Sequence, residues 1–290
     1  MPRVSCVLDA RARLGEGAVW SVAMQRLLWV DIPAGHLHRF DPATGRNETW
    51  PLGRPVGCVA ETARGTVMAA LTDGFVEIDL RTGAQAPPRG PAPEAFGHRY
   101  NDGTVDPEGR FLAGTMPRDG PSDRDDTGAL VRLDGPRAEV LERGYRTVNG
   151  MAFAPDGRTF YISDSHPKVR MVWSRDYHPE TGRMGPARPF FDTRQVAGRP
   201  DGAAMDADGC YWMAGVGGWQ LYRIAPDGRL DMTVDLPVER PTRIAFGGAD
   251  LKTLFVTSIR VEDDSKQPRS GGLFALEIKG VQGLPMPVLR

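Results

Sequence analysis

The stretch Asn149-Gly-Met-Ala-Phe-Ala-Pro-Asp-Gly157 decides the fold, because its spacing returns elsewhere in the chain. It opens on a polar residue that stands eight positions before a turn glycine. The same spacing separates Asn101 from Gly109 and Asp201 from Gly209. Equivalent positions of a sequence repeat become equivalent positions in space. We therefore expect these three polar side chains to meet.

A second offset brings more positions into the repeat. Glu16 lies fifteen residues before Asp31, as Asn149 lies fifteen before Asp164. Together the two offsets define a ring of six positions, Glu16, Gly57, Asn101, Asn149, Asp201 and Arg243. Successive members are 41 to 52 residues apart, close to the roughly 40–50 residues of one propeller blade.

Short β-branched and aromatic runs between glycine and proline predict strands rather than helices. Six strand pairs follow the ring positions: 26–31 with 36–40, 66–71 with 74–79, 110–115 with 129–133, 158–164 with 168–173, 210–214 with 220–224, and 253–258 with 272–278. An apolar segment precedes each pair. The pattern predicts an all-β, six-bladed β-propeller with four-stranded antiparallel blades, as a single domain over residues 1–290. In such a fold the first strand of each blade lines the central channel.

The last blade needs a closing strand, since an open sheet edge invites aggregation. Two apolar segments compete for this place, Val4–Leu8 and Met286–Leu289. The longest irregular segment, Met116–Gly128, contains four aspartates and is predicted to be a loop at one rim.

Composition narrows the possible partners. The chain has 37 acidic and 36 basic side chains, which gives no reason to expect nucleic acid or an anionic membrane. The three cysteines show no CxxC spacing and indicate a reducing compartment. The segment from Met1 to Glu16 does not resemble a signal peptide, and no apolar run approaches the roughly 18 residues of a membrane span. We expect a cytoplasmic protein that binds a small molecule, and the sequence leaves its oligomeric state open.

The ring is rich in oxygen ligands. Glu16 and Asp201 supply carboxylates and Asn149 an amide oxygen. Such a set suits Ca²⁺, Mg²⁺ or Mn²⁺ better than a structural zinc site. Three protein ligands leave positions for water and for a substrate carbonyl, which the cation polarises. The alternative is a group of channel side chains solvated by ordered water.

Two arginines extend this set. Arg99 and Asn101 alternate along a strand and so point the same way, which predicts contacts with substrate hydroxyls. The alternative for Arg99 is a rim position beside a loop carboxylate. Arg243 stands at a ring position, where it compensates the two carboxylates or contacts the substrate directly.

Other catalytic groups are hard to find. His36 and His38 share a strand face and are interpreted as exposed, while His166 follows a strand and is a candidate for the channel mouth. The sequence contains no GxSxG, HExxH or Walker-type motif. This disfavours a serine or cysteine nucleophile and favours attack by water assisted by a metal.

Several motifs resemble the family of gluconolactonase, regucalcin and luciferin-regenerating enzyme. They are Leu14-Gly-Glu-Gly-Ala-Val-Trp20, Asn101-Asp-Gly-Thr-Val-Asp106, Ala113-Gly-Thr-Met116, Asn149–Gly157, Pro200-Asp-Gly202 and Ala245-Phe-Gly-Gly248. They run in family order over nearly the whole chain. The resemblance implies a six-bladed propeller with one divalent cation in its channel, Ca²⁺ first and Zn²⁺, Mn²⁺, Mg²⁺ or Fe²⁺ as alternatives.

The resemblance also implies roles for single residues. Glu16, Asn149 and Asp201 match the family's metal ligands, and Asp201 its general base. Arg99 and Asn101 match the residues that contact a sugar lactone. Some relatives carry a substrate-contacting glutamate shortly after the Ala113–Met116 motif, where this chain has Pro117-Arg118-Asp119. This difference and Arg243 fall where substrate selectivity is expected to be set.

These observations predict a metal-dependent lactonase that opens an aldonolactone to the aldonic acid. Two alternatives stay open. One is hydrolysis of aryl esters or organophosphates on the same kind of propeller, and the other is a non-catalytic protein that binds calcium or a metabolite.

Overall fold

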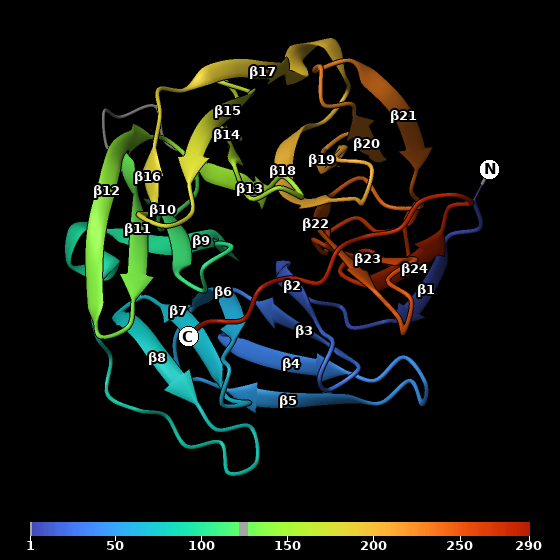
Figure 1. Cartoon of the computed structure of the whole chain (residues 1–290). Helices are drawn as coiled ribbons and strands as arrows, with labels where there is room; N and C mark the ends of the chain where they lie inside the picture. The colour runs from blue at the N-terminus through green and yellow to red at the C-terminus, as the bar shows by residue number, and fades with distance from the viewer. Residues whose placement is uncertain (1, 122–126) are drawn as a thin grey trace.

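A computed structural model describes residues 2–121 and 127–290 of the chain. Strands form six antiparallel sheets arranged in a ring (Figure 1), and the centre of this ring is called the channel. The first three sheets contain β2 (Gly15–Ser21), β3 (Arg26–Asp31), β4 (His36–Phe40) and β5 (Asn47–Pro51), then β6 (Val56–Glu61), β7 (Val67–Leu71) and β8 (Gly74–Ile78), then β9 (His98–Val105), β10 (Phe111–Pro117), β11 (Gly128–Asp134) and β12 (Arg137–Tyr145).

The other three sheets complete the ring. They contain β13 (Val148–Phe153), β14 (Thr159–Asp164), β15 (Met171–His178), β16 (Arg183–Met184) and β17 (Arg188–Asp192), then β18 (Arg199–Met205), β19 (Tyr211–Val216), β20 (Gln220–Ile224) and β21 (Leu230–Asp235), then β22 (Pro241–Gly247), β23 (Thr253–Ser258), β24 (Leu273–Glu277) and β1 (Ser5–Leu8). Two 3₁₀ helices, η1 (Pro93–Phe96) and η2 (Thr193–Gln195), lie in connections. The predicted all-β, six-bladed propeller is confirmed.

Two sheets depart from four strands. The second has three, and single bridges from Gln85 to Ile78 and from Arg89 to Phe75 stand where a fourth strand would pair. In the fourth sheet both β16 and β17 pair with β15. The strand expected at 168–173 begins only at Met171, because the chain turns at His166–Arg170 and Arg170 adopts φ 53°.

The first strand of each sheet faces the channel, and neighbouring first strands touch around the ring, β2 with β6 and β22, and β13 with β9 and β18. Apolar clusters fill the wedges between neighbouring sheets. Val30 and Leu37 of one sheet, for example, pack with Val56 and Leu71 of the next. This burial supplies the main stabilisation of the fold.

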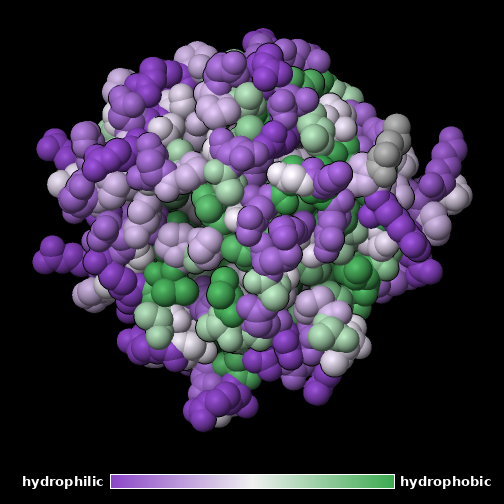
Figure 2. Space-filling model, turned by 45° about the vertical axis from the view of Figure 1, so that its right-hand side comes forward, coloured by the Kyte–Doolittle hydropathy of each residue, from purple (hydrophilic) through white to green (hydrophobic). Residues whose placement is uncertain are grey.

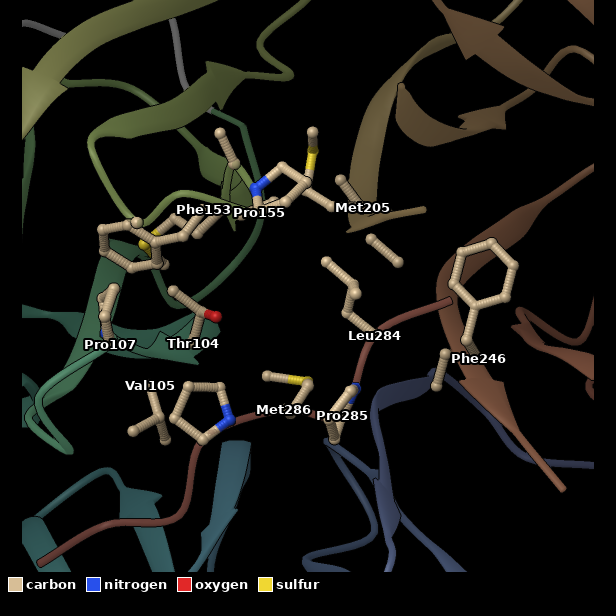
Figure 3. Close-up of a pocket in the computed structure, with 18 of the residues that line it drawn as sticks. Thr104, Val105, Pro107, Phe153, Pro155, Met205, Phe246, Leu284, Pro285 and Met286 are labelled. Carbon is tan, nitrogen blue, oxygen red and sulfur yellow. The ribbon is translucent and has the colours of Figure 1, made fainter. Parts of the chain in front are cut away.

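The N-terminal segment closes the last blade. Strand β1 pairs antiparallel with β24, so of the two competing segments the one at 4–8 is the closing strand. The C-terminal segment does something else. It crosses one end of the channel (Figures 1 and 3), and Leu289 forms a parallel bridge with Thr62 of the second blade.

Every channel-lining strand carries a β-bulge beside its ring position. The pairing register shifts in β2 after Glu16, in β6 beside Gly57, in β9 at Asn101–Asp102, in β13 after Asn149, in β18 at Asp201–Gly202 and in β22 at Thr242–Arg243. A bulge bends a strand and re-aims its side chains. The six bulges therefore repeat one local geometry at the positions that the sequence offsets predict.

The surface offers few large apolar groups. On the face in Figure 2, hydrophilic residues dominate and hydrophobic ones form small separate patches.

The interpretation of His38 as exposed is wrong, since it is 8% exposed and stacks on Trp29 with ring centroids 4.0 Å apart. Within the described part of the chain, no helix has the length and apolar character needed to cross a membrane.

Candidate active site

Two ring carboxyls lie in direct contact. Glu16 of β2 and Asp201 of β18 are buried and share a side-chain hydrogen bond. Burial, reinforced by the charge of Asp102, raises the pKa of Glu16 to about 7. Burial and the neighbouring Glu16 raise the pKa of Asp201 well above its usual range. Two carboxyls this close need a shared proton or a bound cation to offset their repulsion.

Asn149 of β13 presents a free acceptor. Its Nδ2 donates to Ser165 Oγ at 2.8 Å, which fixes the orientation of the amide. Its Oδ1 is buried and has no hydrogen-bond partner among the described residues. An unsatisfied buried acceptor costs roughly 1–3 kcal/mol, so this oxygen indicates a ligand that the protein itself does not supply.

Whether the site suits a divalent cation depends on the donor atoms that it offers. The donor set of two buried carboxyls and one orphaned amide oxygen is the oxygen-rich kind that hard cations prefer. Within residues 2–121 and 127–290, no three His, Cys, Asp or Glu side chains gather as a metal site. The candidate centre therefore depends on the Asn149 amide as third ligand. With it, the residues present fit the cation.

Arg99 and Asn101 of β9 lie together, as their alternation predicts. Arg99 Nη1 donates to Asn101 Oδ1 at 2.6 Å and to the Tyr100 carbonyl at 3.0 Å, and Asn101 Nδ2 donates to the Val148 carbonyl at 2.9 Å. Burial lowers the pKa of Arg99 to about 10, against the opposing charges of Glu16 and Asp201. Arg99 therefore stays protonated near neutral pH and lies within electrostatic reach of both carboxyls.

Arg243 of β22 is only 2% exposed, and its guanidinium meets Asp102, a residue that sequence reasoning missed. Arg243 Nη1 lies 2.6 Å from Asp102 Oδ1. The backbone N–H groups of Gly103 and Met151 also donate to the Asp102 carboxylate. Strict alternation would turn Asp102 away from Asn101, but the bulge of β9 brings it to the channel. The signal was present as the glycine that follows Asp102.

Glycines make room for this packing. A side chain at Gly202 would collide with the Arg243 side chain, and one at Gly57 would collide with the backbone of Tyr100. Gly57 therefore occupies its ring position without contributing a side chain. The ring holds five side chains rather than six.

The aspartates fifteen positions after Glu16 and Asn149 accept hydrogen bonds from the backbone that leads into the channel strands. Asp31 accepts from the N–H groups of Arg13 and Leu14. Asp164 accepts in the same way from Arg146 and Thr147, and also from His166. The repeated carboxylate thus satisfies backbone donors just before each strand. His166 is buried here, and its contact with substrate stays a prediction.

The opposite end of the channel is apolar. A cavity of about 230 Å³ lies among the later residues of the same strands, and the C-terminal segment lines it through Leu284, Pro285 and Met286 (Figure 3). Arg243 also lines the cavity, whereas Glu16, Asn149 and Asp201 do not. We call the two parts the ring end and the tail end of the channel.

Comparison with known proteins places the chain among propellers of one family. Residues 14–260 match the SMP-30/Gluconolactonase/LRE-like region. A 6-deoxy-6-sulfogluconolactonase of Pseudomonas putida is 39% identical over 98% of both chains. The pentonolactonase XacC of Haloferax volcanii is 33% identical over 95% of this chain and 94% of its own.

A solved structure agrees with these sequence matches. The crystal structure of a calcium-binding protein, regucalcin, from Agrobacterium tumefaciens superposes with a TM-score of 0.92, at 29% identity over 98% of this chain and 96% of that one. The family match and the relatives above 30% identity both span most of the chain. This chain therefore belongs to the SMP-30/gluconolactonase/LRE-like family.

Proposed function

We propose that this protein is a divalent-cation-dependent sugar lactonase, which hydrolyses an aldonolactone to the aldonic acid. The observation that carries the proposal is the contact of Glu16 with Asp201, together with the orphaned oxygen of Asn149 at an equivalent position of the repeat. Two relatives that match nearly the whole chain are named as lactonases of sugar acids, and their names support the same reaction here.

In this proposal Glu16, Asn149 and Asp201 hold the cation. When bound, the cation polarises the lactone carbonyl and acidifies water nearby. Its charge also offsets the repulsion between the two buried carboxyls. The oxygen-rich donor set favours Ca²⁺, with Zn²⁺, Mn²⁺, Mg²⁺ and Fe²⁺ as alternatives, because ligand type alone does not select one ion.

The chain's own residues carry out the proton transfers. Asp201 accepts a proton from the water whose oxygen attacks the lactone carbonyl carbon. The ring C–O bond then breaks, and the proton returns to the departing alkoxide to give the hydroxy acid. Asp201 is assigned this task because its motif, Pro200-Asp-Gly202, matches the motif that holds the family's general base. It also touches Glu16 and lies within electrostatic reach of Arg99 and Arg199.

Substrate orientation is assigned to the arginine and amide beside the carboxyls. Arg99 donates only through Nη1 among the described contacts, which leaves its other N–H groups for lactone hydroxyls. The Asn101 amide holds Arg99 in place and has remaining capacity on its oxygen. Arg243 is assigned a compensating role, because Asp102 engages its guanidinium and it lies buried beneath Gly202. A direct contact of Arg243 with substrate stays a prediction.

A substrate panel tests the proposal. Hydrolysis is followed by pH-stat titration with glucono-1,5-lactone, pentonolactones, a sulfonated gluconolactone, an aryl ester and an organophosphate, each at saturating Ca²⁺. We expect turnover of at least one sugar lactone, and no turnover of the aryl ester or organophosphate. Turnover confined to those esters would favour the esterase alternative. Calcium binding without any turnover would overturn the enzymatic proposal.

A further inference from the structure

A second arginine repeats the placement of Arg99. Arg199 stands two residues before Asp201 on β18, as Arg99 stands two before Asn101 on β9. Residues two apart in a strand point to the same face. Each arginine is therefore directed to the same side as its ring residue, about 7 Å further back along the strand, at the entry to the ring end.

Neither arginine is neutralised by a direct ion pair. Within residues 2–121 and 127–290, neither Arg99 nor Arg199 has a carboxylate within ion-pair distance, and both are half-buried. Among the described residues, the one side-chain hydrogen bond of Arg199 runs from Nη1 to the Ser165 carbonyl at 3.2 Å. Ser165 also accepts from the Asn149 amide. Arg199 is thereby tethered near the metal-ligand candidate Asn149, and most of its N–H groups have no partner in the part of the chain that the structure describes.

The charges around the ring end balance only without a cation. Three carboxyls (Glu16, Asp102 and Asp201) interact with three guanidiniums (Arg99, Arg199 and Arg243). A divalent cation makes this group of charges positive. Half-buried positive charge of this kind favours an anionic partner, because screening by solvent is weak there.

We propose that Arg199, together with Arg99, binds an anionic group on the sugar, so that this site selects lactones bearing a carboxylate, sulfonate or phosphate. The inference rests on the proposed lactonase function and deepens it. A guanidinium suits this role because its planar N–H groups match the oxygens of such groups two at a time. The lactone carbonyl lies at the carboxyl pair, and the anionic group points back toward the two arginines.

The test compares a matched pair of substrates, glucono-1,5-lactone and 6-phosphoglucono-1,5-lactone, by pH-stat titration with Ca²⁺ present. Wild-type protein is expected to show a higher kcat/KM for the phosphorylated lactone. Loss of a hydrogen bond to a charged group corresponds to roughly a tenfold to hundredfold change. Arg199→Gln should lower kcat/KM by that factor for the phosphorylated lactone and by less than about threefold for the neutral one.

Two further variants separate a local contact from a general loss of charge or of structure. Arg199→Lys keeps the charge and should retain more activity on the phosphorylated lactone than Arg199→Gln. Arg229, in the same blade, is exposed and pairs with Asp231. Arg229→Gln should leave both substrates unchanged. Equal loss on both lactones in Arg199→Gln would show a merely structural role and overturn the inference.

Binding of the open-chain acids gives a readout that does not depend on turnover. Calorimetry should show 6-phosphogluconate binding at least tenfold more tightly than gluconate, and Arg199→Gln should remove the difference. If the protein hydrolyses lactones without any preference for charge, the inference falls and the proposed function stands. If no lactone is hydrolysed but the charge-selective binding holds, the proposed function falls, and with it the selection of lactones, while the role of Arg199 in binding an anionic group stands.

Discussion

The two ends of the channel are built by the same strands but serve opposite purposes. At the ring end, a bulge stands beside each of Glu16, Asn149 and Asp201. The carboxyls of Glu16 and Asp201 touch, and the buried Asn149 oxygen has no partner among the described residues. At the tail end, regular pairing resumes and apolar residues pack against the C-terminal segment. The contrast shows that the same strands carry unsatisfied polar groups at one end of the channel and well-packed apolar side chains a few residues later.

Of the changes at the ring end, Asp201→Asn should lower the lactonase activity most. Loss of a general base and of an anionic cation ligand lowers kcat/KM for a sugar lactone by about 10²–10⁴-fold. Because the variant also removes a buried carboxyl that touches Glu16, the metal-free protein should be at least as stable as wild type. Lactone assays and thermal unfolding after chelation check both parts. Activity within about threefold of wild type would refute the role of Asp201.

At the tail end, Leu289→Ala should lower the stability of the protein and leave its activity nearly unchanged. Leu289 is 3% exposed, packs with Phe75 and Val105, and exchanges backbone hydrogen bonds with Glu61 and Ala63. Truncating it costs about 2–5 kcal/mol of unfolding free energy, with kcat/KM at 25 °C close to wild type.

The neighbouring residue Val288 supplies the control for this variant. It is 40% exposed, so Val288→Ala should change stability by less than about 0.5 kcal/mol. Urea unfolding of both variants makes the comparison. Equal stability of Leu289→Ala and wild type would show that the tail does not brace the propeller.

His38, which lies outside both ends of the channel, should make the stability of the fold depend on pH. Burial, with a smaller contribution from His36, lowers the pKa of His38 to about 4, and Asn47 Nδ2 lies 3.1 Å from His38 Nδ1. The unfolded chain takes up a proton near pH 6.5 that the folded protein accepts only near pH 4. Stability from this group is therefore full above about pH 6.5 and falls by about 3 kcal/mol as the pH drops to 4.

The variant His38→Gln cannot take up this proton. Between pH 7 and 4, the unfolding free energy of the variant should therefore fall by about 3 kcal/mol less than that of wild type. Comparing the two proteins cancels the contributions of all other titrating groups. Urea unfolding across that range measures the difference. Parallel pH profiles for the two proteins would contradict the assignment to His38.

Ser165 tests the orientation of the third ligand. Ser165→Ala removes the acceptor for the Asn149 amide and allows the amide to turn its oxygen away. We expect Ca²⁺ affinity to fall about 10–100-fold. Ser21 is also buried and accepts a hydrogen bond from the backbone N–H of Met24, so Ser21→Ala should leave the affinity unchanged. Calorimetric titration of both proteins decides, and equal affinities would remove Asn149 from the ligand set.

The repeat made the ring predictable from sequence. Equal offsets reveal equivalent positions, and the glycine after Glu16, Asn149 and Asp201 marks the bulge that directs each side chain. Asp102 escaped prediction because strand alternation assigns it to the face opposite Asn101. The glycine that follows Asp102 is a sequence signal of a bulge, and the pairing register of β9 shows that this bulge overrides the alternation.

Features without a repeat could not be predicted in the same way. The bridge between Leu289 and Thr62 occurs once and joins residues far apart in sequence, so no offset announces it. His38 lies on the same strand face as His36, yet its burial depends on stacking against Trp29. Such packing emerges only when neighbouring strands are placed side by side.

The dependence of lactone hydrolysis on a divalent cation tests the central claim most directly. Glucono-1,5-lactone and its 6-phosphate are assayed by pH-stat before chelation, after chelation, and after re-addition of Ca²⁺, Mn²⁺, Mg²⁺, Zn²⁺ or Fe²⁺. We predict that chelation abolishes turnover of the better substrate and that at least one of these ions restores it. Full turnover by the chelated protein would contradict the assignment of Glu16, Asn149 and Asp201 as a cation site.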